Sequence, residues 1–179
     1  NIVELAMDTD DLSSLVAALI QADAGLVDLL QTDGPFTVFA PTNQAFTDLL
    51  DALGDDYNSL ADFDTTDEKM LLADILKYHV VTAQALSTDL EDGDMIATAQ
   101  GEDVKISLTG GVFIQDATDT DAQVTAADIM ASNGVIHLVN KVLLPQDIAN
   151  SLRPNIVELA MDTDDLSSLV AALIQADAG

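Results

Sequence analysis

The first 25 residues of the chain occur a second time, letter for letter, at its end. Residues 1–25 read NIVELAMDTDDLSSLVAALIQADAG, and residues 155–179 read the same. Neither chance nor convergence on an amphipathic pattern produces identity over such a length. Self-similarity at a fixed offset is typical of repeated structural units. The offset from Asn1 to Asn155 is 154 residues, so the sequence contains one unit of that length and the start of another.

Two explanations account for the repeat, namely a natural array of near-identical modules or an engineered duplication. We favour the array, and both explanations give the same domain organisation. We expect residues 1–150 to form one module, residues 151–154 to form a short link, and residues 155–179 to begin the next module. A segment this short does not bury its apolar face alone, so the second copy needs a partner surface.

The balance of charge excludes several classes of partner. Thirty-two acidic residues face five basic ones, which gives a formal net charge of −27 at pH 7. Nucleic-acid binders use Lys and Arg to neutralise phosphates, so we expect no nucleic-acid partner. We also predict no membrane insertion, because no stretch approaches the roughly 18 apolar residues of a membrane helix. Salt screens the self-repulsion of so acidic a protein, which favours a saline or calcium-containing habitat.

Apolar periodicity predicts helices in the first half of the chain and strands in the second. The first long helix carries an apolar stripe at helical spacing made of Leu12, Leu15, Val16, Leu19 and Ile20. Further helices are predicted over residues 44–53 and 65–77, the second opening on a capping box. Strands are predicted over residues 36–40, 78–82, 104–108, 112–114, 135–139 and 142–144. Helices followed by strands indicate the α+β class.

Three sequence blocks in fixed order resemble the fasciclin (FAS1) domain family. They are FTVFAPTNQAF at residues 36–46, YHVV at residues 78–81, and NGVIHLV at residues 133–139, which continues to Leu-Leu-Pro at residues 143–145. The resemblance implies a FAS1 fold, a wedge-shaped β-sandwich with N-terminal helices packed around it. It further implies an extracellular or cell-surface adhesion role, usually in tandem copies and without a cofactor.

The resemblance also nominates residues for partner binding. Animal matrix relatives carry an adhesive Glu-Pro-Asp-Ile-Met segment just before the last block, and the same place here reads Ala-Ala-Asp-Ile-Met. Asp128, Ile129 and Met130 are therefore candidates, together with Tyr78 and His79 of the central block. The alternative is that Ile129 and Met130 pack in the core while Asp128 supports a turn.

The sequence contains little that indicates a catalytic site. His79 and His137 are the only histidines, and each lies in a family block beside apolar residues. We interpret both as hydrogen-bonded structural residues rather than as a catalytic or metal-binding pair. The sequence contains no Gly-x-Ser-x-Gly elbow, phosphate-binding glycine loop or His-Glu-x-x-His motif. We therefore predict that the protein is not an enzyme.

Calcium is the strongest small-ligand hypothesis. The ion takes roughly six to eight oxygen ligands, which clustered acids on a loop can supply. Asp116, Asp119 and Asp121 form such a cluster between predicted strands, although the loop lacks the glycine and terminal glutamate of an EF-hand. The alternative is a solvated acidic surface.

The second copy of the repeated segment leads to two hypotheses about function. We predict that its apolar stripe serves packing between modules through Leu166, Leu169, Val170, Leu173 and Ile174. In one hypothesis the chain is an adhesion or matrix module that binds a cell-surface or matrix protein or glycan. In the other it is a structural repeat of an extracellular fibre, in which residues 155–179 dock on a neighbouring module.

Overall fold

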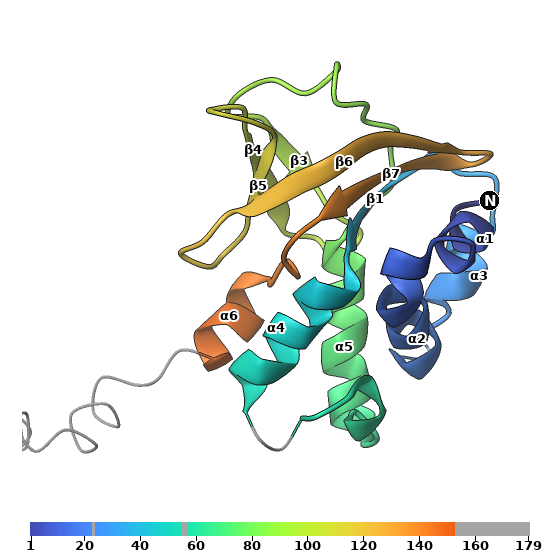
Figure 1. The fold of residues 1–179 in the computed structure, drawn as a ribbon, viewed down its shortest axis with the longest axis vertical. Coiled ribbons are helices and arrows are strands. Elements are labelled where there is room, and N and C mark those ends of the chain that lie inside the picture. The colour runs from blue at the N-terminus through green and yellow to red at the C-terminus, as the bar shows by residue number, and fades with distance from the viewer. Residues whose placement is uncertain (23, 55–56, 153–179) are drawn as a thin grey trace, which may run out of the picture. The chain divides into compact units, whose positions relative to one another are not determined.

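The computed structural model describes residues 1–22, 24–54 and 57–152 (Figure 1). By its internal contacts the chain divides into two units, Asn1–Ala149 and Asn150–Gly179. The predicted packing stripe at residues 166–174 lies outside the described residues, as does the rest of the second copy. The helices are α1 (Ile2–Met7), α2 (Ser13–Ala22), α3 (Leu26–Leu30), α4 (Asn43–Leu53), α5 (Thr66–Tyr78) and α6 (Gln146–Leu152), with short 3-10 turns η1 (Asp10–Leu12) and η2 (Leu60–Asp62).

The strands are β1 (Phe36–Pro41), β2 (Val80–Val81), β3 (Met95–Ala97), β4 (Asp103–Ser107), β5 (Phe113–Gln115), β6 (Ala122–Ala131) and β7 (Gly134–Val139). They form a seven-stranded sheet in the order β2-β1-β7-β6-β5-β4-β3. Its two ends approach each other, since the Ala99 amide beyond β3 donates to the Val80 carbonyl of β2 at 2.7 Å. The sheet is therefore nearly closed, and the predicted α+β class is confirmed.

Local sequence signals explain where the helices begin. The Asn1 side chain accepts a hydrogen bond from the Glu4 amide, and the Thr65 hydroxyl accepts one from the Glu68 amide. In both cases the glutamate carboxylate returns the contact to the backbone nitrogen of the cap residue, which is the reciprocal arrangement of a capping box. Thr42 caps α4 through its hydroxyl alone, which accepts a hydrogen bond from the amide of Ala45. The predicted helices at 44–53 and 65–77 are thus confirmed within one residue.

Two predicted strands differ from the structure. Helix α5 continues through Tyr78, and β2 contains only Val80 and Val81. Residues 142–144 are buried but form no strand. Two of their backbone amides are satisfied by side chains instead, because Leu143 donates to His79 Nε2 and Leu144 to the Asp116 carboxylate.

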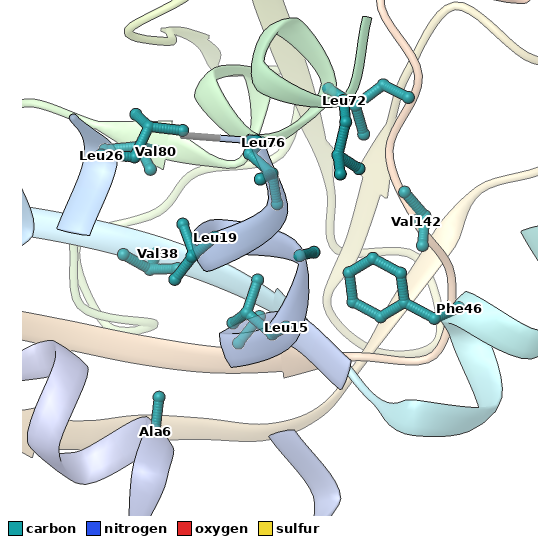
Figure 2. Close-up of a cluster of buried hydrophobic side chains, with 14 of the residues drawn as sticks. Ala6, Leu15, Leu19, Leu26, Val38, Phe46, Leu72, Leu76, Val80 and Val142 are labelled. Atoms are coloured by element: carbon teal, nitrogen blue, oxygen red, sulfur yellow. The ribbon is translucent and has the colours of Figure 1, made fainter. Parts of the chain in front are cut away.

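The central strands separate two hydrophobic cores. Strands β1 and β7 run parallel and are buried along their whole length, as expected when side chains on both faces are covered. The larger core lies between the sheet and the helices and includes Phe46, Leu72 and Leu76 (Figure 2). The smaller core is enclosed by the sheet itself and includes Phe39, Ile106 and Ile114.

The first copy of the repeated segment belongs to the larger core. Its buried apolar residues are Ile2, Val3, Ala6, Leu12, Leu15, Ala18, Leu19 and Ala22. The predicted stripe is partly wrong, because Ile20 is 63% exposed and Val16 is half-buried. The small side chains of Ala18 and Ala22 let α2 approach its neighbours closely. The buried face of α2 is therefore rotated toward these alanines relative to the predicted stripe. Each large aliphatic side chain buried here contributes roughly 1.5–3 kcal/mol.

Candidate interaction surface

Asp128 lies at an irregular point of the long strand β6. The pairing of β6 with β7 shifts register between Val124 and Ala126 and again before Ile129, and Asp128 adopts a positive φ of 58°. Its carboxylate accepts hydrogen bonds from the Ser87 hydroxyl and from the Ser87 amide, the latter at 2.7 Å. The Ser87 hydroxyl and amide hold the pKa of Asp128 below its usual value. Asp128 thus ties the segment around Ser87 to the sheet.

The neighbours of Asp128 have opposite environments. Ile129 is half-buried and packs against the larger core, whereas Met130 is 57% exposed. The expectation that Met130 packs in the core is therefore wrong for that residue. Of the predicted Asp-Ile-Met segment, only the methionine offers its side chain largely to solvent, on a backbone held in place by the contacts of Asp128.

Tyr78 and His79 do not belong to a surface. Each is only 1% exposed, so neither side chain is available to a partner, and their nomination for partner binding is corrected. Tyr78 projects into the smaller core, where its hydroxyl donates to the Asp103 carbonyl at 3.2 Å. Burial, reinforced by the carboxylates of Asp116, Glu102 and Asp103, raises the pKa of Tyr78.

The hydrogen bonds of His79 identify its tautomer. Nδ1 lies 2.7 Å from the Ile75 carbonyl, to which it donates, and Nε2 accepts from the Leu143 amide at 2.8 Å. A protonated ring would place two donors, Nε2–H and the Leu143 N–H, face to face. Burial lowers the pKa of His79 to about 4. His79 is therefore a neutral structural residue that joins α5 to the segment after β7.

His137, Asp128 and Ser87 bring together the residue types of a serine-hydrolase triad. In that chemistry the imidazole accepts the serine proton and the carboxylate orients the imidazole. Here the Ser87 hydroxyl donates to the carboxylate, and His137 Nδ1 accepts from the backbone amide of Asp128 at 3.2 Å. His137 Nε2 faces the Ala85 carbonyl at 2.8 Å. The contacts therefore suit a structural link between β6, β7 and residues 83–87.

The three carboxylates nominated for calcium are not brought together as a metal cluster. Asp116 has a fully buried carboxylate that contacts the Lys141 ammonium at 2.9 Å. Asp121 accepts a hydrogen bond from Gln115, and Asp119 is exposed on the loop. No group of three or more His, Asp or Glu side chains among the described residues is placed to hold a metal ion. Calcium binding at this loop remains an untested hypothesis.

The Lys141 ammonium occupies a cage of oxygen atoms. Its three N–H groups donate to the Asp116 carboxylate, both of whose oxygens are in reach, to the Thr118 hydroxyl, and to the Thr120 carbonyl at 2.7 Å. The same carboxylate also accepts from the amides of Thr118 and Leu144. The lysine therefore connects the end of β7 to the loop after β5. Sequence reasoning missed this contact because nothing local links residues so far apart in the chain.

Substituting Lys141 with methionine is expected to lower the free energy of unfolding by about 2 kcal/mol, because it removes the charged hydrogen-bond donor of the buried Asp116 carboxylate. Lys77→Met is the matched control. The Lys77 side chain is 38% exposed, and its Nζ lies 4.0 Å from Oδ1 of Asp74. Such surface pairs contribute roughly 0–1 kcal/mol. Urea unfolding measures both changes, and equal effects in the two variants would show that the cage adds nothing to stability.

Comparison with known proteins identifies the family. The fasciclin domain model matches residues 10–145. Protein sll1483 of Synechocystis sp. is 39% identical over 145 residues, which cover 80% of this chain and 73% of that protein. Human periostin is 32% identical over 136 residues, 76% of this chain and 15% of periostin. This chain therefore corresponds to a small part of periostin's length.

A solved structure supports the same assignment at the level of the fold. A FAS1 domain pair from the insect cell adhesion molecule Fasciclin I matches with a TM-score of 0.57 at 14% identity, covering 89% of this chain and 52% of that one. The FAS1 fold implied by the three sequence blocks is confirmed. Among the residues described, no helix has both the length and the apolarity to cross a membrane. The family match and the shared fold together show that this chain belongs to the fasciclin domain family.

Proposed function

We propose that the chain is a non-catalytic adhesion module that acts outside the cell or at its surface through contacts between proteins. Membership of the fasciclin family supports this function, and the insect protein with the same fold is a cell adhesion molecule. The partners proposed are other copies of the same module or a cell-surface or matrix protein or glycan.

The exposure of the Met130 side chain is the observation that indicates which residue makes the proposed contact. Methionine is flexible and polarizable, and it is enriched at protein interfaces. Met130 is 57% exposed on the long strand β6, whose path is fixed by the bonds between Asp128 and Ser87. Because the backbone is already held in place, binding here has to order only the methionine side chain, so this part of β6 suits a contact with another protein.

Beads coated with the chain and exposed to shear flow test the function. We expect them to attach to at least one of three surfaces, coated with the same chain, with fibronectin or with collagen. Met130→Asp is expected to reduce that attachment several-fold, because it places a charge in an apolar contact. Met95→Asp is the matched control, since Met95 is 60% exposed on the edge strand β3. Attachment no greater than that of uncoated beads on all three surfaces would refute adhesion.

A second candidate function is a structural repeat of an extracellular fibre. It is favoured by the identity of residues 1–25 and 155–179 together with the burial of the first copy in the module. In this case the partner of the module is another copy of itself, and adhesion through Met130 is not required.

A further inference from the structure

We propose that Met130 is a reversible oxidation site, at which a peroxide converts the thioether to a sulfoxide and weakens the contact that this side chain makes with a partner. The loss of contact rests on the proposed adhesive function, whereas the oxidation itself does not. Three features carry it, namely the placement of sulfur in the module, the chemistry of the thioether, and the environment of Met130.

The sulfur atoms lie on the surface throughout the described part of the chain. The sequence contains five methionines and no cysteine. Met161 lies outside the described residues, and the other four are each between 57% and 60% exposed, namely Met7, Met70, Met95 and Met130. Neither core, as far as the structure describes it, contains a methionine or has one packed against it. Methionine is among the residue types most often fully buried, so packing does not account for this placement.

A peroxide oxidises an exposed thioether without help from another group. With hydrogen peroxide, the O–O bond breaks as the S–O bond forms, and two electrons pass from the sulfur to the oxidant. A proton passes from the attacked oxygen to the departing one, which leaves as water. Because the chain contains neither cysteine nor tryptophan, no thiol or indole competes with the methionines. Methionine sulfoxide reductases restore the thioether, so the change is reversible.

Oxidation of Met130 leaves the interior of the module unchanged. Successive side chains of a strand point to opposite faces, and Ile129 packs against the larger core while Met130 is exposed. The backbone of Met130 pairs with Val135 of β7, and the residues before it are held by the bonds between Asp128 and Ser87. None of these contacts uses the sulfur. A sulfoxide here is solvated by water, whereas in a core it would disrupt packing.

The same oxidation changes what Met130 offers to a partner. The thioether is flexible, apolar and polarizable, whereas the sulfoxide is polar. A polar group that is buried in a contact without a hydrogen-bond partner opposes binding. The other methionines of the described chain lie on α1, α5 and β3, so their oxidation does not alter the surface of β6. Attachment therefore depends on the state of the Met130 sulfur.

The test uses the full chain and two variants, Met130→Leu and Met95→Leu. Leucine preserves the apolar volume of methionine but has no sulfur to oxidise. Each protein is treated with hydrogen peroxide, and peptide mass spectrometry measures the oxygen gained at each methionine. Urea unfolding and the attachment of coated beads under shear flow are measured before oxidation, after it, and after treatment with the reductases for both sulfoxide epimers.

In the wild type, Met130 is expected to be oxidised about as fast as in the urea-unfolded chain. The free energy of unfolding is expected to stay unchanged, while attachment falls several-fold and the reductases restore it. Met95→Leu is expected to behave as the wild type, and Met130→Leu to attach equally well before and after oxidation. The proposal is overturned if folding protects Met130 more than about tenfold from the peroxide, if oxidation unfolds the module, if the oxidised wild type attaches undiminished, or if oxidised Met130→Leu loses as much attachment.

Failure of the adhesive function would be visible before any oxidant is added, because the untreated wild type would attach to no surface. The oxidation site is then judged without a partner, by retention on a hydrophobic-interaction column. Oxidation is expected to shorten the retention of the wild type more than that of Met130→Leu, because only the wild type loses an apolar side chain on β6. Equal shortening in the two proteins would overturn the proposal.

Discussion

Gly134→Ala is expected to lower the free energy of unfolding by at least about 4 kcal/mol, which is beyond the range of most single substitutions. Gly134 pairs with Phe36 at the start of the parallel β1–β7 ladder. A Cβ on Gly134 would lie 2.1 Å from the Phe36 carbonyl oxygen and 2.8 Å from Cδ1 of Ile2. Neither neighbour is free to move, because one is the backbone of a central strand and the other is a buried residue of α1.

Gly25→Ala is the matched control for Gly134→Ala. Gly25 has a φ of 68°, and a Cβ added to it would have no atom within 4 Å, so alanine there experiences only backbone strain of about 1 kcal/mol. Urea unfolding at pH 7 compares both variants with the wild type. Similar losses in the two variants would mean that β1 and β7 separate easily, which would contradict the close packing of this strand pair.

The elements that depend on local signals are predictable from the sequence. Thr65 begins a helix as expected, and Asn1 begins one by the same local signal, because their partners Glu68 and Glu4 lie three residues away. The hairpin formed by β4 and β5 also follows from alternation on either side of Gly110 and Gly111. In these segments the information that specifies the structure is contained in a few neighbouring residues.

Long-range contacts set the features that the sequence did not reveal. Asn43 is the first residue of α4, yet its side chain binds the backbone of Asp10 and Ser14. Asn133 lies in the turn before β7, and its side chain joins the amide of Ile2 to the carbonyls of Leu30 and Thr32. Periodicity carries no signal for such contacts, because they depend on the tertiary arrangement of the elements.

The candidate site shows the same division. The family blocks predicted that the Asp-Ile-Met segment lies just before β7, and the structure places it in β6. The role of each residue depends on its side chain's environment, which the sequence blocks do not specify. The irregular strand directs the Asp128 carboxylate to Ser87 and leaves the Met130 side chain exposed. Tyr78 and His79 share a block with a strand, but helix α5 continues far enough to carry the tyrosine into the smaller core.

The stability of the protein is expected to fall by about 3 kcal/mol between pH 7 and pH 4 because of His79 alone. The pKa of His79 is about 4 in the folded protein, against an ordinary value of 6.5. Between these values the unfolded chain binds a proton that the folded chain does not. Protonation therefore favours unfolding as the pH falls, and the full contribution of neutral His79 is present above about pH 6.5.

Comparison of the wild type with His79→Gln isolates this effect. Urea unfolding is measured from pH 7.5 to pH 5.5, above the range near pH 4 in which most carboxylates titrate. We expect the wild type to lose about 1 kcal/mol more than the variant over this interval, and His137, present in both, cancels in the difference. NMR of the wild type gives a second reading, in which one of the two imidazoles stays neutral until about pH 4. The His79 ring donates to the Ile75 carbonyl and accepts from the Leu143 amide, so it cannot be charged without losing the bond from Leu143. Parallel pH profiles of the wild type and the variant, together with protonation of both imidazoles near pH 6.5, would therefore contradict a buried, neutral His79.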